Sequence, residues 1–162
     1  MTEAEKRLKR CSFTGHRPEK LQSSETAVQK ALAEAISNAY ADGFRTFISG
    51  MARGVDIWAA ELVLEYKSLH PDIHLICALP HPDFETRWKA EWQKRYNAIL
   101  TQADLVKIVC DSYTPGAYQR RNEWMVDHSS RVIAVYNGEP GGTRNTICYA
   151  KKLGIMVVNV AR

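Results

Sequence analysis

Residues 47–61 read FISGMARGVDIWAAE, in which an apolar run ends at a serine and two glycines follow it four positions apart. Asp56 then precedes an alanine-rich apolar segment. The apolar run indicates a buried strand, and the segment after the glycines indicates a helix. The glycines between them either close a tight turn or let an anionic ligand approach the helix start. The stretch alone leaves both interpretations open.

Length and composition are those of an ordinary globular protein. The chain has 162 residues, which suits one domain with a substantial core and is short for two. The formal net charge of +4 suits an anionic small molecule, but without a basic stripe it does not predict nucleic acid binding. The apolar run after the basic N-terminus is too short for a signal peptide or a membrane span. We expect a single domain over residues 1–162, with its core at about 11–160, in the cytoplasm.

The cysteines and histidines do not indicate a metal site. The four cysteines are widely spaced, with no CxxC pair, and Cys11, Cys77 and Cys110 lie in apolar runs. Small buried side chains are the expected interpretation. His70 and His74 have helical spacing, but a proline and an aspartate between them mark a loop. We therefore expect no metal, and the free thiols fit a reducing compartment.

Six short apolar runs recur along the chain, separated mostly by amphipathic segments. We expect strands at 11–14, 46–49, 73–79, 105–110, 132–136 and 155–160. We expect helices from the serines at 23 and 24 to the glycine at 43, then at 57–69, about 83–100, about 118–129 and 146–153. This alternation predicts an α/β three-layer sandwich with a mostly parallel sheet of about six strands, because each crossover is right-handed.

Aromatic residues recur at helical spacing in the third of these helices, at Phe84, Trp88, Trp92 and Tyr96. Such a stripe more often packs in a core or an interface than it stacks on bases. We expect packing and keep base stacking as the less favoured alternative.

In a parallel sheet the carboxyl ends of all strands lie along one edge, and ligands bind there near the point where strand order reverses. The turns that follow the strands are therefore the candidate site. After the first strand come Thr14, Gly15, His16 and Arg17. Arg17 could clamp a phosphate or a carboxylate through two nitrogens. A simple surface turn is the alternative interpretation.

The turn after the second strand has the glycine spacing described first. Its candidate residues are Ser49, Gly50, Met51, Ala52, Gly54 and Asp56. Glycine at a helix start lets an anion approach unpaired backbone N–H groups and the positive end of the helix dipole. Asp56 could accept ribose hydroxyls, orient an arginine, or only stabilise the helix start. The spacing matches neither GxGxxG nor a P-loop with its lysine.

Two later helix starts add polar groups to the same edge. Arg121 and Asn122 follow the fourth strand, where they could meet negative charge or form a solvated helix face. Gly141, Gly142 and Thr143 follow the fifth strand and combine glycines with a hydroxyl. One shared anion site explains these turns better than four unrelated turns do.

Four motifs together resemble the YpsA-like branch of the SLOG superfamily. They are TGHRP at 14–18, SGMARGVDIWAAE at 49–61, RRNEWM at 120–125 and PGGT at 140–143. The resemblance covers nearly the whole chain, over 11–160, and implies a Rossmann-like fold with a nucleotide-derived ligand. The superfamily includes the Lonely Guy phosphoribohydrolases, which release cytokinin-type bases from nucleotides, and the DNA-processing protein DprA.

The resemblance extends to particular positions. Gly50, Ala52, Gly54 and Asp56 match the glycine loop of DprA-like proteins. Arg121, Asn122 and Met125 lie where Lonely Guy enzymes have an arginine, a lysine and a methionine. Residues 140–143 match a shortened form of the PGGxGT loop of those enzymes. Their loop continues to a catalytic glutamate, whereas residues 144–147 here read RNTI, with no carboxylate.

The leading interpretation is a cytoplasmic binding or sensor domain for a nucleotide-derived ligand such as an ADP-ribose-like molecule, with no catalytic residue. The alternative is a hydrolase of the phosphoribohydrolase type, in which Glu123 or Asp56 would be the available general base. DNA binding in the manner of DprA is less favoured, because phosphate contacts dominate such binding and the charge is mild. A homo-oligomer stays open, and no membrane partner is expected.

Overall fold

Six parallel strands form the central sheet of the computed structural model, which describes residues 1–160. They are β1 (Arg10–Gly15), β2 (Thr46–Ser49), β3 (His74–Leu79), β4 (Leu105–Ile108), β5 (Arg131–Val135) and β6 (Met156–Asn159). Their order across the sheet is β4-β3-β2-β1-β5-β6, and every neighbouring pair is parallel. All six predicted strands are confirmed. The largest difference is at β4, which ends at Ile108 and not at Cys110.

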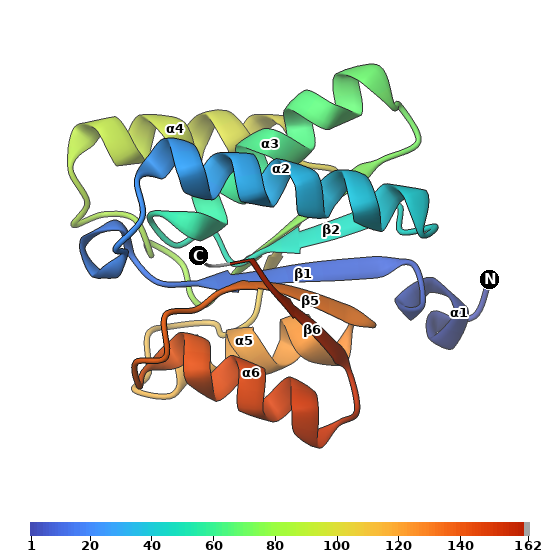
Figure 1. Cartoon of the computed structure of the whole chain (residues 1–162). Helices are drawn as coiled ribbons and strands as arrows, with labels where there is room; N and C mark the ends of the chain where they lie inside the picture. The colour runs from blue at the N-terminus through green and yellow to red at the C-terminus, as the bar shows by residue number, and fades with distance from the viewer. Residues whose placement is uncertain (161–162) are drawn as a thin grey trace.

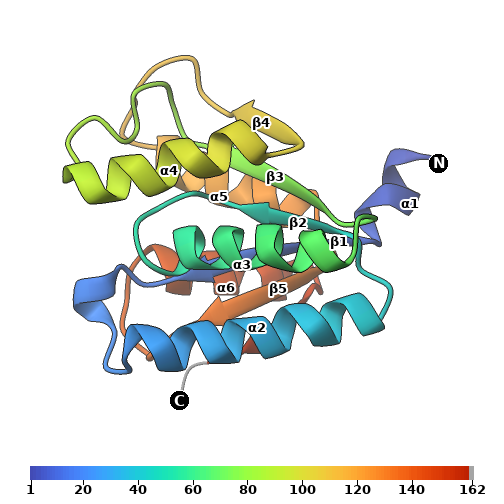
Figure 2. The same cartoon turned by 90° about the horizontal axis from the view of Figure 1, so that it is seen from above.

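Helices cover both faces of the sheet (Figure 1). On one face lie α2 (Glu25–Ala41), α3 (Val55–Leu69) and α4 (Ala90–Gln102), side by side in Figure 2. On the other face lie α5 (Ala117–Asp127) and α6 (Gly142–Lys152). This is the predicted Rossmann-like α/β sandwich. Strand order reverses between β1 and β5, and the loops beyond the strand carboxyl ends gather at the left of Figure 1.

The core lies on both sides of the sheet because its central strands are buried on both faces. In β2, Phe47 packs on the α2–α4 side, where its ring stacks on Phe13 with centroids 6.0 Å apart. The next residue, Ile48, packs on the opposite side against Met125 of α5. The continuous apolar run in the sequence is thus the consequence of two covered faces.

The helix predicted at about 83–100 begins later, at Ala90. Asp83 has a φ of 61°, which lies in the left-handed region, and turns and a bend without helix follow over residues 84–88. Residues 80–89 therefore form a loop, and Phe84 and Trp88 lie in that loop. The prediction of one continuous helix is wrong here, because the aromatic spacing continued across a segment with a different backbone.

Two other helix starts differ from the prediction. The helix predicted at 146–153 begins at Gly142, so the PGGT motif runs directly into its first turn. A short helix, α1 (Glu3–Arg7), precedes β1 and was not predicted, although Thr2 and Glu5 form a capping box that signals it. A single 3-10 turn, η1 (Pro18–Lys20), follows β1.

The structure also describes the cysteines, the apolar character of the helices and the grouping of metal-ligating side chains. Cys11, Cys77 and Cys110 are buried as predicted, and Cys148 is exposed. Over residues 1–160, no helix has both the length and the apolar character required to cross a membrane. The same residues contain no group of three or more His, Cys, Asp or Glu side chains placed to hold a metal ion.

Candidate ligand-binding site

A cleft of about 400 Å³ lies at the carboxyl edge of the sheet. It brings together most of the residues predicted from the sequence, namely Thr14, Gly15, His16, Arg17, Ala52, Asp56, Arg121, Asn122, Gly141, Gly142 and Thr143. These residues come from the end of β1 and the turn after it, the turns after β2 and β5, the first turns of α3 and α6, and the second turn of α5. The predicted residues Ser49, Gly50, Met51 and Gly54 are not part of its lining.

The turn after β1 supplies a buried histidine and an exposed arginine. His16 is buried, and its ring stacks on Tyr136 with centroids 5.7 Å apart. Burial lowers the pKa of His16, which favours the neutral imidazole. Its Nε2 atom is buried without a hydrogen-bond partner among residues 1–160. Arg17 is exposed and lines the cleft.

Gly15 allows the end of β1 to pack against the start of α3. A Cβ atom added at Gly15 would lie 2.5 Å from Cγ1 and 2.6 Å from Cβ of Val55, which is fully buried. Glycine at this position therefore allows a close approach to the end of β1. The structure identifies the approaching group as Val55.

We predict that Gly15→Ala lowers the free energy of unfolding by about 1–3 kcal/mol, as overpacking of a buried site does. Gly142→Ala is the matched control, because a Cβ there would meet only Asn122 Nδ2, at 3.8 Å. Denaturant unfolding of both variants tests this. Equal stability of the two variants would show that the Val55 contact does not require glycine.

Ser49, Gly50, Met51 and Gly54 belong to the same loop as Ala52 and Arg53 but do not line the cleft. Ser49 Oγ donates to the Asp56 carbonyl at 2.8 Å and accepts from the Met51 N–H at 3.2 Å. Met51 has a φ of 61° and its side chain is fully buried in the core. Gly54 has a φ of 91°, and a Cβ there would lie 2.7 Å from Pro18 Cδ. Ser49, Met51 and Gly54 thus make contacts inside the loop or with its neighbours.

Gly50 leaves room for a buried pair of opposite charges. A Cβ added at Gly50 would lie 3.0 Å from Arg121 Cζ and 3.0 Å from Asp56 Oδ2. Arg121 is only 5% exposed, and its Nη1 donates to the Gly50 carbonyl and, at 3.4 Å, to the Ala78 carbonyl. Its Nε donates to Asn122 Oδ1 at 2.8 Å. Arg121 thus joins the start of α5 to the residues that follow β2 and end β3.

Asp56 is the other member of the pair and is 8% exposed. Its Oδ2 accepts the Ala52 N–H at 3.3 Å, whereas Oδ1 is buried with no hydrogen-bond partner in the described part of the chain. Burial raises the pKa of Asp56 to about 6, although the Arg121 charge and the Ala52 N–H act in the opposite direction. The cleft therefore contains a buried carboxyl group with an unused acceptor atom.

The start of α6 supplies backbone donors. Gly141 has a φ of 142°, and the Asn145 N–H makes the first helical bond to its carbonyl, at 3.0 Å. The N–H groups of Gly142, Thr143 and Arg144 therefore have no acceptor within the helix. Together with the helix dipole they attract an anion. Thr143 is nearly buried and adds a hydroxyl to the cleft.

Several lining residues were not predicted from the sequence: Phe13, Lys20, Arg53, Phe84, Trp88 and Tyr118. Arg53 lies inside the predicted glycine loop, and Lys20 follows the predicted turn after β1, so both had a detectable signal. The helical spacing of Phe84 and Trp88 predicts packing along a helix, and therefore gave no signal for the cleft. Arg17, Lys20 and Arg53 thus add three positive side chains to that of the buried Arg121 in the cleft.

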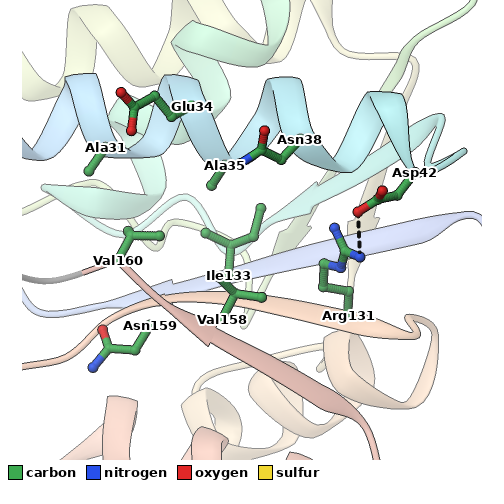
Figure 3. A pocket seen from close by; sticks show the side chains of 10 residues that line it. All are labelled: Ala31, Glu34, Ala35, Asn38, Asp42, Arg131, Ile133, Val158, Asn159 and Val160. Atoms are coloured by element: carbon green, nitrogen blue, oxygen red, sulfur yellow. Dashed lines mark hydrogen bonds and ion pairs between the residues drawn. The ribbon is translucent and has the colours of Figure 1, made fainter.

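A second groove, of about 380 Å³, runs between α2 and the β5–β6 part of the sheet (Figure 3). Ala31 and Ala35 of α2 face Ile133 and Val158 across it. Its arginine, Arg131, is already paired with Asp42 at 2.8 Å. The groove lies on the sheet face and lacks the helix start and the unpartnered buried carboxyl oxygen of the first cleft, which is therefore the better candidate site.

Known structures resemble this fold. The structure of TM1055 has a TM-score of 0.61 at 15% identity, covering 93% of this chain and 72% of that one. DNA processing protein A from Helicobacter pylori has a TM-score of 0.65 at 19% identity, covering 96% of this chain and 66% of that one. A molybdenum cofactor binding protein from Rippkaea orientalis has a TM-score of 0.56 at 19% identity, covering 93% and 75%. At these identities the likeness shows the fold alone.

Sequence comparison identifies nearer relatives. A UPF0398 protein of Bacillus cereus strain G9842 is 31% identical over 156 residues, which cover 91% of this chain and 85% of that protein. The SPbeta prophage-derived protein YoqJ of Bacillus subtilis strain 168 is 38% identical over 118 residues, covering 65% and 69%. The family model YpsA, described as "YspA SLOG family", matches residues 11–153. With a family match over most of its length, and the TGHRP, SGMARGVD and PGGT motifs within it, the chain belongs to the YpsA family of the SLOG superfamily.

Proposed function

We propose that the chain binds a phosphorylated ribonucleoside, such as a nucleotide or an ADP-ribose-like molecule, and acts as a binding or sensor domain. The observation that carries the proposal is one cleft that combines the start of α6, three cationic side chains and a buried carboxyl acceptor. Its volume of about 400 Å³ lies within the range of small-molecule pockets, about 300–1,000 Å³.

The anionic end of the ligand is assigned to the start of α6. The free N–H groups after Gly141 and the Thr143 hydroxyl can donate to phosphate oxygens. Arg17 and Lys20 are exposed at the same cleft, and neither forms an ion pair with a carboxylate within residues 1–160. Arg53 lies 3.8 Å from Glu19, a long contact that leaves its charge available. Phosphate would thus meet backbone donors and positive charge together.

The ribose is assigned to the Asp56 side of the cleft. Its buried Oδ1 needs a donor, and a sugar hydroxyl is a donor that a phosphate is not. Asn122 lines the same region, with its Oδ1 occupied by Arg121 Nε. Its Nδ2 group therefore remains as a donor toward the ligand.

A hydrolase is the second candidate, and the raised pKa of Asp56 is the observation that favours it. The other carboxylate considered from the sequence, Glu123, does not line the cleft and accepts a hydrogen bond from Gln119 at 2.9 Å. Release of free base from nucleotides by the wild type, but not by Asp56→Asn, would support the hydrolase. The DprA-like fold supports nucleic acid binding less well, because the cleft has the size of a small molecule.

We predict that Arg17→Ala weakens the binding of a nucleoside monophosphate about tenfold, because a charge-assisted hydrogen bond contributes about 1.5–3 kcal/mol. The melting temperature without ligand should stay the same, since Arg17 is exposed. Calorimetry against a panel of nucleotides and ADP-ribose measures both quantities. Lys151→Ala, in the last turn of α6, is the matched control.

The proposal fails if no member of the panel stabilises the folded wild-type protein. The assignment of Arg17 alone fails if Arg17→Ala and Lys151→Ala bind with equal affinity.

A further inference from the structure

One wall of the cleft is aromatic. Phe84 and Trp88 come from the loop between β3 and α4, and Tyr118 comes from the first turn of α5. None of the three is fully buried, and Tyr118 is 42% exposed. Core packing alone does not account for three rings that remain partly open to the same cleft.

Buried rings hold this wall in place from behind. Phe84 contacts Trp88 with centroids 5.0 Å apart and Tyr118 with centroids 5.7 Å apart. Behind them, the buried Tyr96 lies edge-on to Trp88 at 5.3 Å. The buried His81 ring lies 6.0 Å from Phe84 and 5.9 Å from Tyr118. The wall is therefore ordered without a ligand, which lowers the entropy cost of binding.

The wall adjoins the polar part of the cleft. The Arg121 guanidinium lies 5.6 Å from the Phe84 centroid and 6.0 Å from the Tyr118 centroid. Two rings of the wall thus lie next to Arg121, beside Asp56. The start of α6 and the cations line the same cleft. A ligand that fills both parts must have a flat ring and an anionic group.

We propose that the wall of Phe84, Trp88 and Tyr118 stacks on the nucleobase of the ligand, so that the ligand class is an intact nucleotide and not a sugar phosphate. This inference rests on the proposed function and adds the base and its position to it. Stacking reads the π-face and not the hydrogen-bonding edge, so the wall accepts any base. Selectivity among bases is therefore expected to be weak.

The test compares three ligands that share parts: adenosine 5′-monophosphate, ribose 5-phosphate and adenosine. Calorimetry should show that the wild type binds the nucleotide at least about tenfold more tightly than ribose 5-phosphate. Tyr118→Ala should weaken nucleotide binding about tenfold and leave ribose 5-phosphate binding unchanged. Tyr118→Phe, which keeps the ring, should bind the nucleotide like the wild type. Tyr66→Ala is the matched control, since Tyr66 lies near the end of α3, does not line the cleft, and has ring contacts only with Tyr40 and His70 within residues 1–160.

The stacking proposal is overturned if ribose 5-phosphate binds as tightly as the nucleotide, or if Tyr118→Ala weakens both equally. The proposed function would survive either result. If adenosine binds as tightly as the nucleotide, the wall stands and the phosphate assignment at α6 is overturned. If none of the three ligands binds the folded protein, the stacking proposal is overturned; the proposed function is overturned only if the wider panel of nucleotides and ADP-ribose also fails to bind.

Discussion

Replacing Arg121 with alanine should lower the free energy of unfolding by about 2–4 kcal/mol, because it leaves buried carbonyl groups without their hydrogen-bond donor. Arg121 is 5% exposed, and its loss leaves two carbonyls, those of Gly50 and Ala78, without their donor. It also removes the charge that favours the ionised form of Asp56. Ligand binding should be lost as well, because the α5 start and the β2 turn would no longer be held together.

Arg120→Ala is the matched control, since Arg120 is adjacent in α5 and exposed. It should change the free energy of unfolding by no more than about 0.5 kcal/mol. Arg121→Lys should recover little, because a single ammonium group cannot reproduce the planar set of donors. Denaturant unfolding of the three variants decides the matter. Similar curves for Arg120→Ala and Arg121→Ala would contradict a structural role for the buried guanidinium.

Acidification should stabilise the wild type relative to Asp56→Asn. Burial raises the pKa of Asp56 from 3.8 to about 6, so the folded state binds the proton more tightly than the unfolded state. The stabilising contribution is complete below the unfolded pKa and is lost as pH rises through the folded pKa. With about 1.4 kcal/mol per pKa unit, the wild type should lose about 2 kcal/mol of stability relative to the variant between about pH 4 and pH 7.

The measurement is the free energy of unfolding of both proteins at several values between about pH 4 and pH 7. Taking the difference at each pH cancels the titration of other groups, which are common to the two proteins. The stability of the wild type relative to the variant should fall as pH rises. A difference that stays constant, or that grows with pH, would show that folding does not raise the pKa of Asp56.

The sheet could be predicted from sequence because parallel strands covered on both faces appear as continuous apolar runs. The position of the candidate site followed from the same argument, since the carboxyl ends of parallel strands share an edge. The direction of individual side chains did not follow. Met51 and Arg121 illustrate this, because one faces the core and the other is buried against carbonyls far away in the sequence.

Glycines and aromatic residues were the least predictable parts of the candidate site. Whether a glycine admits a ligand or a neighbouring side chain depends on tertiary contacts, such as those of Gly15 with Val55 and Gly54 with Pro18. For Phe84, the helical spacing predicted a helix, but the residue lies in the loop that follows Asp83, which has a positive φ. Local pattern thus predicted most elements but not this one, and distant contacts determine what each residue touches.

The hydrogen bonds of Arg121 also bear on how the protein can move. One side chain, carried by α5, holds carbonyls that follow β2 and end β3. The N-terminal half of α5 therefore cannot open by itself, as helix ends usually do, without releasing both strand ends. Fluctuations at this corner of the fold should be rare and concerted, so that three segments open as one cooperative unit. Slow amide exchange would accompany such coupling, and a ligand that enters the cleft would meet a surface that is already assembled.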